Sequence, residues 1–454
     1  AGLDTSGFNI PLTLAVQGDV PPAECWRAAW DELISRHDAL RTGFSEDASG
    51  VLRRVVVDRL DATLDLRAAP SLDAAQRYLR DRQSEPFSMG APGLWRAGLI
   101  QVTGSGQTIF WFIMHHAVVD GISLGILIDE LVTLLRGDAL APPAISFDRS
   151  CAGEAAYLGS ETAQADAAYW QFIVGGLVER APDALAEWPL DKPRPNARTA
   201  AALKGSHCFR TRLGPATANG LRSLARQNGS SLHALMLALL GHEVRRRTGR
   251  PELLLGTAAS TRQSAAEART IGYFVNMLPL TCRTGVAGSI HAAIRAMQQE
   301  LAGALQHSRY PFARIYGDFR RERPQATHPA RYPLFDIAVT ENPSVGASPE
   351  TGLRFTGIAA PEIGDIVYEL RRNGPAQDLV LVHEGQSDGG LLVTGYLNAA
   401  IYTKDTARNW FDALVGWMQF LADAPPGEDR PLPRLLPQEE HLLDDWQKGP
   451  SRPL

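Results

Sequence analysis

Hydrophobic residues follow two patterns along the chain. Short, nearly unbroken apolar runs predict buried strands, as in QTIFWFIMHH at 107–116. Apolar residues three and four positions apart predict helices, as at Trp26, Trp30 and Leu33, and again over 123–137. The same patterns predict further strands over 9–20, 51–58, 205–214, 252–260, 273–283, 333–341 and 389–402, and further helices over 71–87, 166–177, 220–229, 231–249 and 406–424.

The order of these elements predicts an α+β fold in two parts. Both halves mix antiparallel-looking strands with helices, and 454 residues suit two sizeable domains. A stretch rich in proline and small residues at 181–201 is the natural linker. We expect an N-terminal lobe over 1–175, a C-terminal lobe over 176–430 and a proline-rich tether over 431–454.

Composition and charge indicate which binding partners and which cellular compartment suit the protein. A net charge of -5 without a block of lysine or arginine gives no footprint for nucleic acid or an anionic membrane. The longest apolar runs are far shorter than a membrane span, and no signal peptide is visible at the N-terminus. The cysteines lie far apart, which argues against a disulfide framework and a cysteine zinc site. We therefore expect a cytoplasmic protein.

The stretch MHHAVVDGISLG (114–125) has two competing interpretations. Its end spells G-x-S-x-G, the serine nucleophile elbow, but that elbow needs its serine directly where strand meets helix. Ser123 comes seven residues after His116 and is expected at the helix N-cap instead. A metal site formed by His115, His116 and Asp120 is not supported either, because the H-E-x-x-H spacing is absent and the two histidines point to opposite faces of the strand.

Strand alternation separates the two histidines. Neighbouring side chains on a strand point to opposite faces, so one of His115 and His116 can serve chemistry while the other is tied into the structure. Asp120 lies in the following turn, where its carboxylate can bind backbone N–H groups or an arginine. Gly121 permits a sharp entry into the helix. The plain alternative, two polar residues closing a strand, remains open from the residues alone.

The stretch HHAVVDG (115–121) resembles the HHxxxDG signature of the chloramphenicol-acetyltransferase-like acyltransferases. Further stretches resemble one branch of that superfamily, the condensation domains of nonribosomal peptide synthetases: RHDALRTGF (36–44), PLDKPRP (189–195), RRRTGRPELLLGTAAS (245–260), IGYFVNMLPL (271–280), HSRYPF (307–312), RYPLF (331–335) and LPRLLPQEEHLLDDWQKGP (432–450). Three features depart from the family pattern, one of which is that a block with tyrosine, aspartate and tryptophan is replaced by SFDRSCAGEAAY (146–157). The family's first block is missing, and Ala313 stands where glutamate is usual.

The resemblance implies two acetyltransferase-like lobes in a V, with mixed sheets, flanking helices and a central tunnel. It also implies amide formation between a donor acyl or peptidyl thioester and the amine of an acceptor aminoacyl thioester. Both substrates would arrive on phosphopantetheine arms of an upstream and a downstream carrier protein, beside an adenylation domain. The domain itself would bind no cofactor and no metal.

The resemblance also assigns roles to residues. His116 is expected to act as the general base or as the hydrogen-bond partner of the attacking amine, and His115 to be structural. Asp120 is expected to be a brace that pairs with Arg36 or, second, with Arg41. Gly121 would keep the acceptor approach open.

Two alternatives stay open at this point. One is a free-standing acyl-CoA-dependent O- or N-acyltransferase resembling the wax ester synthases. The other is a non-catalytic recruitment domain of the same fold.

Overall fold

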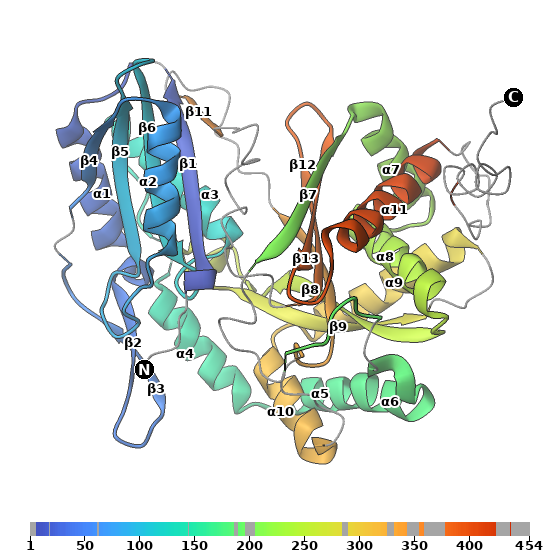
Figure 1. Ribbon diagram of the computed structural model, residues 1–454. Helices are drawn as coiled ribbons and strands as arrows, with labels where there is room; N and C mark the ends of the chain where they lie inside the picture. The colour runs from blue at the N-terminus through green and yellow to red at the C-terminus, as the bar shows by residue number, and fades with distance from the viewer. Residues whose placement is uncertain are drawn as a thin grey trace, which may run out of the picture.

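The protein is described by a computed structural model in which the placed residues are 6–17, 19–60, 63–143, 145–185, 189–195, 205–283, 289–324, 331–342, 354–357, 377–423 and 436. Within these ranges two large sheets stand side by side, each flanked by helices. They diverge toward the top of Figure 1 as the two arms of a V. The predicted α+β class and the two-lobe architecture are confirmed.

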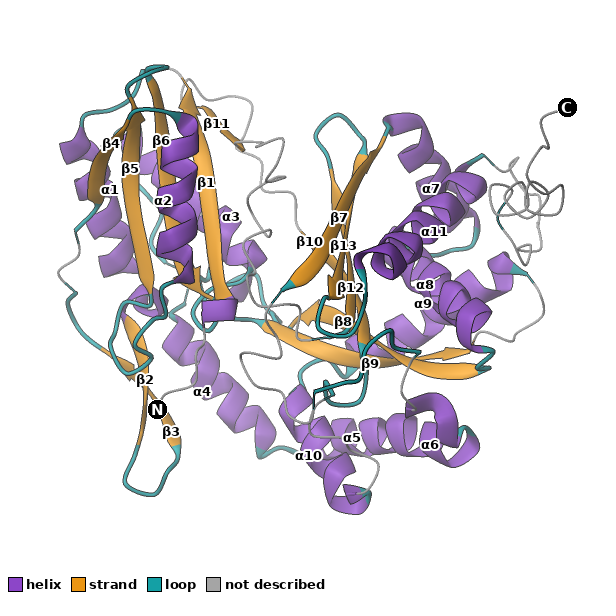
Figure 2. Cartoon of the chain, in the orientation of Figure 1, coloured by secondary structure: helices purple, strands orange, loops and turns teal. Residues whose placement is uncertain are grey.

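The first lobe is built on a five-stranded sheet. Its strands, in spatial order, are β11 (Arg354–Gly357), β1 (Asn9–Gln17), β6 (Gln107–His115), β5 (Trp95–Val102) and β4 (Asp65–Ala69). The helices that cover it are α1 (Ala23–Arg36) and α3 (Gly121–Leu135) on one face and α2 (Leu72–Ser84) on the other; Figure 2 shows this layering. A separate hairpin joins β2 (Thr42–Glu46) to β3 (Leu52–Val56).

The central strand β6 shows why its sequence is apolar almost throughout. Phe110 and Phe112 enter the core beneath α1 and α3, whereas Ile109 and Trp111 enter the core beneath α2. Because both faces of the sheet are covered, no face of the strand is left for polar residues. The two histidines follow at its end, where that double cover stops.

The second lobe is built on a six-stranded sheet. Its strands, in spatial order, are β7 (Ser206–Leu213), β13 (Leu391–Asn398), β12 (Leu379–Gly385), β10 (Ile337–Asn342), β8 (Glu252–Ser260) and β9 (Val275–Arg283). Its helices are α7 (Pro215–Gln227), α8 (Leu232–Thr248), α9 (Ile290–Gln306) and α11 (Lys404–Ala422). Strand β10 runs parallel to β8 and β12, and the other neighbours are antiparallel.

Most of the predicted elements are present. The structure adds strands β2, β4, β5, β11 and β12 and helices α4 (Phe147–Leu158), α9 and α10 (Phe312–Glu322), which the apolar pattern did not single out. Of the two serines before α8 that could cap it, Ser230 and Ser231, the structure uses Ser231, whose side chain accepts a hydrogen bond from the Ala234 N–H. The tether predicted over 431–454 lies outside the described residues apart from Leu436.

The chain does not keep its two halves apart. Trp170 and Val174, which precede the predicted boundary at 175, pack in the core of the second lobe. Ile271 and Phe274, from the second half, pack in the core of the first lobe. Strand β11 pairs with β1. Each lobe therefore takes residues from both sides of position 175. The lobe boundaries given by the sequence analysis stay a prediction.

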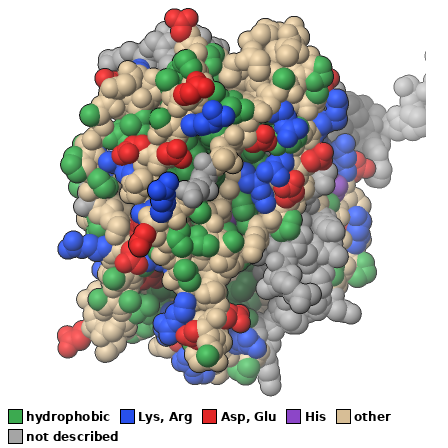
Figure 3. All heavy atoms as spheres, turned by 90° about the vertical axis from the view of Figure 1, so that its left-hand side faces the viewer, with side chains coloured by type: hydrophobic (Ala, Val, Ile, Leu, Met, Phe, Trp, Pro, Cys, Tyr) green, Lys and Arg blue, Asp and Glu red, His purple; other side chains and the backbone are tan. Residues whose placement is uncertain are grey.

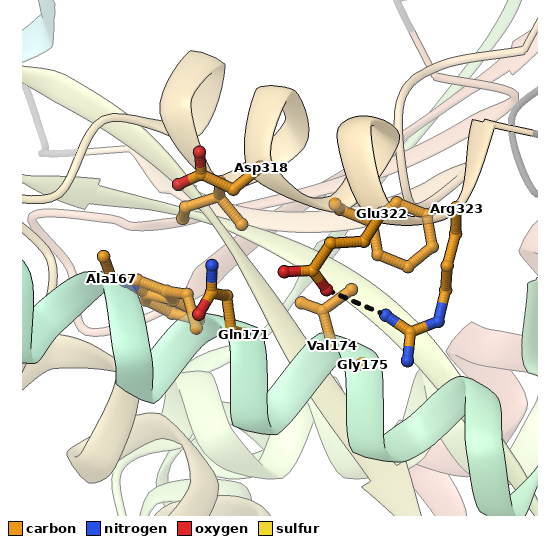
Figure 4. A pocket seen from close by; sticks show the side chains of 10 residues that line it. Ala167, Gln171, Val174, Gly175, Asp318, Glu322 and Arg323 are labelled. Carbon is orange, nitrogen blue, oxygen red and sulfur yellow. Dashed lines mark hydrogen bonds and ion pairs between the residues drawn. The ribbon is translucent and has the colours of Figure 1, made fainter.

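A helical layer closes the bottom of the molecule, formed by α4 (Phe147–Leu158), α5 (Glu161–Trp170), a π-helix (Gln171–Gly175), α6 (Gly176–Arg180) and α10 (Phe312–Glu322). Figure 4 shows the hollow between α10 and the π-helix, where Arg323 and Glu322 form an ion pair above Val174 and Gly175. Its volume of about 10 Å³ admits roughly one water molecule. It is a packing contact between helices.

The surface carries charges of both signs. On the face shown in Figure 3, acidic and basic side chains are interspersed with hydrophobic ones. Among the described helices none combines the length and the apolar character needed to cross a membrane.

Candidate active site

The turn that joins β6 to α3 carries the histidine motif. The backbone N–H of His115 still donates to the Leu94 carbonyl, whereas that of His116 donates to the Phe8 carbonyl. Asp120 is the N-cap of α3, and its side chain accepts a hydrogen bond from the Ser123 N–H (2.8 Å). The motif is thus a strand end, a short turn and a capped helix start.

His116 has a defined tautomer. Its Nδ1 lies 2.7 Å from the Val119 carbonyl oxygen. A carbonyl oxygen only accepts hydrogen bonds, so Nδ1 carries the proton and the neutral ring has its lone pair on Nε2. The ring meets that of Tyr273 edge to face, with the centroids 5.2 Å apart. The side chain that the sequence nominated for chemistry therefore has its basic nitrogen specified by the backbone.

His115 lies in different surroundings, as strand alternation predicted. It is buried between the rings of Phe8 and Phe87, whose centroids lie 6.1 and 6.3 Å from its own. Its Nδ1 accepts a hydrogen bond from the Ala117 N–H (3.1 Å). These contacts brace the start of the turn.

Asp120 joins the two lobes. Its carboxylate is 1% exposed and forms a bidentate ion pair with Arg262, which follows strand β8 in the second lobe. The Arg262 Nη1–Asp120 Oδ2 distance is 2.6 Å, and Arg262 Nη2 lies 3.0 Å from Oδ1. Asp120 Oδ2 also accepts a hydrogen bond from the Phe274 N–H (2.9 Å). Together with the Ser123 N–H, four donors thus compensate the burial of one carboxylate.

The predicted partners of Asp120 were wrong. Arg36 binds Glu130 instead, with Nε 3.1 Å from Oε2, and donates to the Ala141 carbonyl. Arg36 ends α1, which packs along α3. Ten helical residues place Glu130 about 15 Å along α3 from Asp120. Arg41 donates to the carbonyl oxygens of Ile34, Ser35 and Val57.

Glu130 is held as a carboxylate. Although burial acts to raise its pKa, the hydrogen bond from His37 and the charges of His37 and Arg36 keep that pKa below its ordinary value. Arg36 and Arg41 therefore stabilise the first lobe away from the motif turn.

The expectations for Ser123 and Gly121 need correction as well. Ser123 is not the N-cap but lies three residues after it. It is fully buried, its Oγ donates to the Gly272 carbonyl (2.8 Å) and accepts from the Gly272 N–H (3.1 Å) and from Arg262 (2.9 Å). Gly121 is the first residue of α3 and its φ lies outside the left-handed region, so the entry into the helix does not require a left-handed glycine there.

The loop between β8 and β9, residues 261–274, supplies what the sequence did not nominate. Arg262 also donates to the carbonyls of Glu267 and Thr270, and its guanidinium lies 4.2 Å from the Phe274 ring centroid. Burial and the nearby Asp120 charge raise the pKa of Tyr273, which keeps its phenol protonated. A lone arginine directly after a buried strand was the available signal for this loop.

Comparisons with known proteins agree with this architecture. A family model for the condensation domain matches residues 3–441. Surfactin synthase subunit 2 of Bacillus subtilis (strain 168) is 26% identical over 99% of this chain and 12% of its own length. Tyrocidine synthase 3 of Brevibacillus parabrevis is 26% identical over 97% of this chain and 6% of its own length. The chain thus spans a small part of these relatives.

A solved structure shares the fold. The condensation domain from the monacolin K polyketide synthase MokA superposes with a TM-score of 0.77 at 20% identity, covering 92% of this chain and 93% of that one. The histidine motif, the two lobes and the family match over residues 3–441 place the protein in the condensation-domain family.

Proposed function

We propose that the protein forms an amide bond between a donor acyl or peptidyl thioester and the α-amine of an acceptor aminoacyl thioester. The family match and the likeness to the surfactin and tyrocidine synthases support this substrate class. Both substrates would be presented on phosphopantetheine arms, by a donor carrier protein on one side and an acceptor carrier protein on the other. An adenylation domain would adjoin the chain.

The observation that carries the proposal is the hydrogen bond from His116 Nδ1 to the Val119 carbonyl. In the neutral tautomer with the proton on Nδ1, Nε2 is the ring atom that would accept a proton from the attacking amine. The amine nitrogen bonds to the thioester carbonyl carbon, and the C–S bond then breaks. His116 then gives the proton that it accepted from the amine to the departing thiolate, which leaves as a thiol, and the imidazole returns to its starting form.

The demands on His116 are moderate. A free α-amine has a pKa of roughly 7.7–8.0, so a large fraction is neutral near pH 7–8. Alignment of the two arms would supply roughly 7–11 kcal/mol of the barrier. Proton transfer at His116 would add about 10²–10⁴-fold in rate. His115, Asp120 and Gly121 would position the turn that carries His116.

The test is His116→Ala with donor-loaded and acceptor-loaded carrier proteins, followed by the intact mass of the acceptor carrier. We expect the rate of amide formation to fall about 10²–10⁴-fold while the unfolding temperature stays near that of the wild type. His291→Ala, on α9 of the second lobe, serves as the matched control and should keep its activity. Full activity of His116→Ala would remove the role proposed for His116, and no amide formation by the wild type would remove the proposed function.

The same assay separates the alternatives. Transfer from an acyl-CoA to an alcohol or amine, with none from a carrier, would identify a free-standing acyltransferase. A wild-type protein that binds carriers but transfers nothing would be a recruitment domain.

A further inference from the structure

Three side chains with metal-ligating atoms meet in the second lobe, on elements that the motif does not involve. His233 lies at the start of α8, Glu341 on β10 and His383 on β12. Glu341 and His383 are register partners on neighbouring parallel strands, so they project from the same face of the sheet. One ligand atom from each of the three lies within 4.8 Å of both others.

The spacing of the two imidazoles suits a shared cation. His233 Nδ1 and His383 Nε2 are joined by a hydrogen bond of 2.9 Å, so one of the two nitrogens carries a proton that a bound cation would replace. With metal–nitrogen bonds of 2.0–2.1 Å, two histidine nitrogens on one ion are about 2.8–3.4 Å apart, for bond angles between 90° and 109°. Small rotations of the two rings would therefore admit an ion between them and the Glu341 carboxylate.

The surroundings orient one ring for ligation. His233 Nε2 lies 2.6 Å from Thr257 Oγ1, on the neighbouring strand β8. A ligating histidine commonly donates its second ring N–H to such an oxygen, which fixes the tautomer and leaves the first nitrogen for the metal. Thr257 is fully buried, so this partner is held rigidly.

The burial and charge of the three side chains also suit a cation. His383 is 1% exposed, and ligation requires both imidazoles in their neutral form. Within the described residues no basic side chain forms an ion pair with the Glu341 carboxylate. Glu341 is exposed, which gives an entry route from solvent.

We infer that His233, His383 and Glu341 form a binding site for one divalent ion of the Zn²⁺, Co²⁺ or Ni²⁺ type. Two imidazoles and one carboxylate favour these ions over Mg²⁺ and Ca²⁺, which prefer oxygen ligands alone. The remaining coordination positions are taken by water. The bound ion ties the start of α8 to β10 and β12 and so stabilises the second lobe, independently of the chemistry at His116.

The test uses the full chain, stripped with a chelator and dialysed. We expect calorimetric titration with Zn²⁺ to show one ion per chain, visible absorption of bound Co²⁺ to show imidazole ligation, and Zn²⁺ to raise the unfolding temperature. Glu341→Gln should weaken Zn²⁺ binding by more than about 10–100-fold, the usual loss when only an orienting partner is removed. His383→Gln should abolish it.

The matched control is Glu384→Gln. Glu384 follows His383 on β12, so its side chain points to the opposite face of the sheet and its loss should leave Zn²⁺ affinity unchanged. If His383→Gln fails to fold, the exposed Glu341 still decides the matter. A wild-type chain without stoichiometric Zn²⁺ uptake would overturn the inference, and so would equal affinity in Glu341→Gln and Glu384→Gln.

Discussion

Asp120 is the residue on which the geometry of the motif turn depends. Its buried carboxylate binds the start of its own helix, the side chain of Arg262 and the backbone of Phe274. Removing either this carboxylate or its arginine partner would leave a buried charge uncompensated, which lowers the stability of the folded protein strongly. We infer that the aspartate of the motif is a brace between the lobes, and that it acts through Arg262.

We expect Asp120→Ala and Arg262→Ala each to lower the free energy of unfolding by about 3–5 kcal/mol, because each leaves a buried charge without its partner. The double substitution should cost less than the sum of the two. Denaturant unfolding with a double-mutant cycle measures both effects. A stable but inactive Asp120→Ala protein would instead indicate direct participation in catalysis.

An exposed ion pair provides the control for that cycle. Arg53 lies 2.8 Å from Asp47, but its side chain is 65% exposed. Arg53→Ala should therefore leave the free energy of unfolding close to that of the wild type.

Among the structural elements, the loop over 261–274 brings the second lobe to the motif. Gly272 lies against Phe147, and a Cβ on Gly272 would come within 2.2 Å of that ring. Ser123 holds both polar groups of the Gly272 backbone. The loop is thus set by close packing as well as by the Asp120–Arg262 pair.

We expect Gly272→Ala to destabilise the protein by about 1–3 kcal/mol, because the ring of Phe147 or the loop must shift. Tyr273 would then move relative to His116, so amide formation should also slow. Gly125→Ala is the control. Gly125 lies in the middle of α3, and a Cβ at this position would meet no atom within 4 Å. Gly125→Ala should stabilise the protein by roughly 0.5–1 kcal/mol. Thermal unfolding measures both variants, and an equal loss of stability in Gly272→Ala and Gly125→Ala would contradict this account.

His242, on helix α8, makes the stability of the folded protein depend on pH. Burial lowers the pKa of His242 to about 4, below its ordinary value of 6.5, and its ring meets Trp417 edge to face. Between pH 6.5 and pH 4 the unfolded chain binds the proton and the folded chain does not, so stability falls as the pH falls through this window.

We expect His242→Gln to reduce the slope of the free energy of unfolding against pH by up to about 1.4 kcal/mol per pH unit. Denaturant unfolding between about pH 7 and pH 4.5 measures the slope. Identical slopes in the wild type and the variant would show that His242 does not titrate as its burial requires.

On the scale of the whole molecule, the two lobes complete each other's cores. Ile271 and Phe274 pack in the first lobe, and Trp170 and Val174 pack in the second. Strand β11 extends the first sheet from a position late in the chain. The lobes are therefore distinct in architecture but share their packing.

We expect a fragment of residues 1–205 not to unfold cooperatively, because it lacks Ile271, Phe274, Arg262 and strand β11. Near-ultraviolet circular dichroism during heating measures this, with the full chain as the control. A sharp transition in the fragment would support the lobe boundaries predicted from the sequence instead.

The sequence by itself determined the elements with strong local patterns. The apolar run of β6, the spacing of α1 and α8 and the alternation that separates His115 from His116 are all local properties of neighbouring residues. The motif blocks added the two-lobe fold and the family. Strands such as β4, with mixed polar character, gave no comparable local signal.

Only the tertiary structure decided which side chains meet. Arg262 lies 142 residues from Asp120, and both Arg36 and Arg41 offered the same charge nearer in sequence. Helix packing then directed Arg36 to Glu130, and the loop after β8 brought Arg262 to the turn. The physical reason is that local patterns govern burial and backbone shape, whereas charge pairing depends on which segments the packed cores bring together.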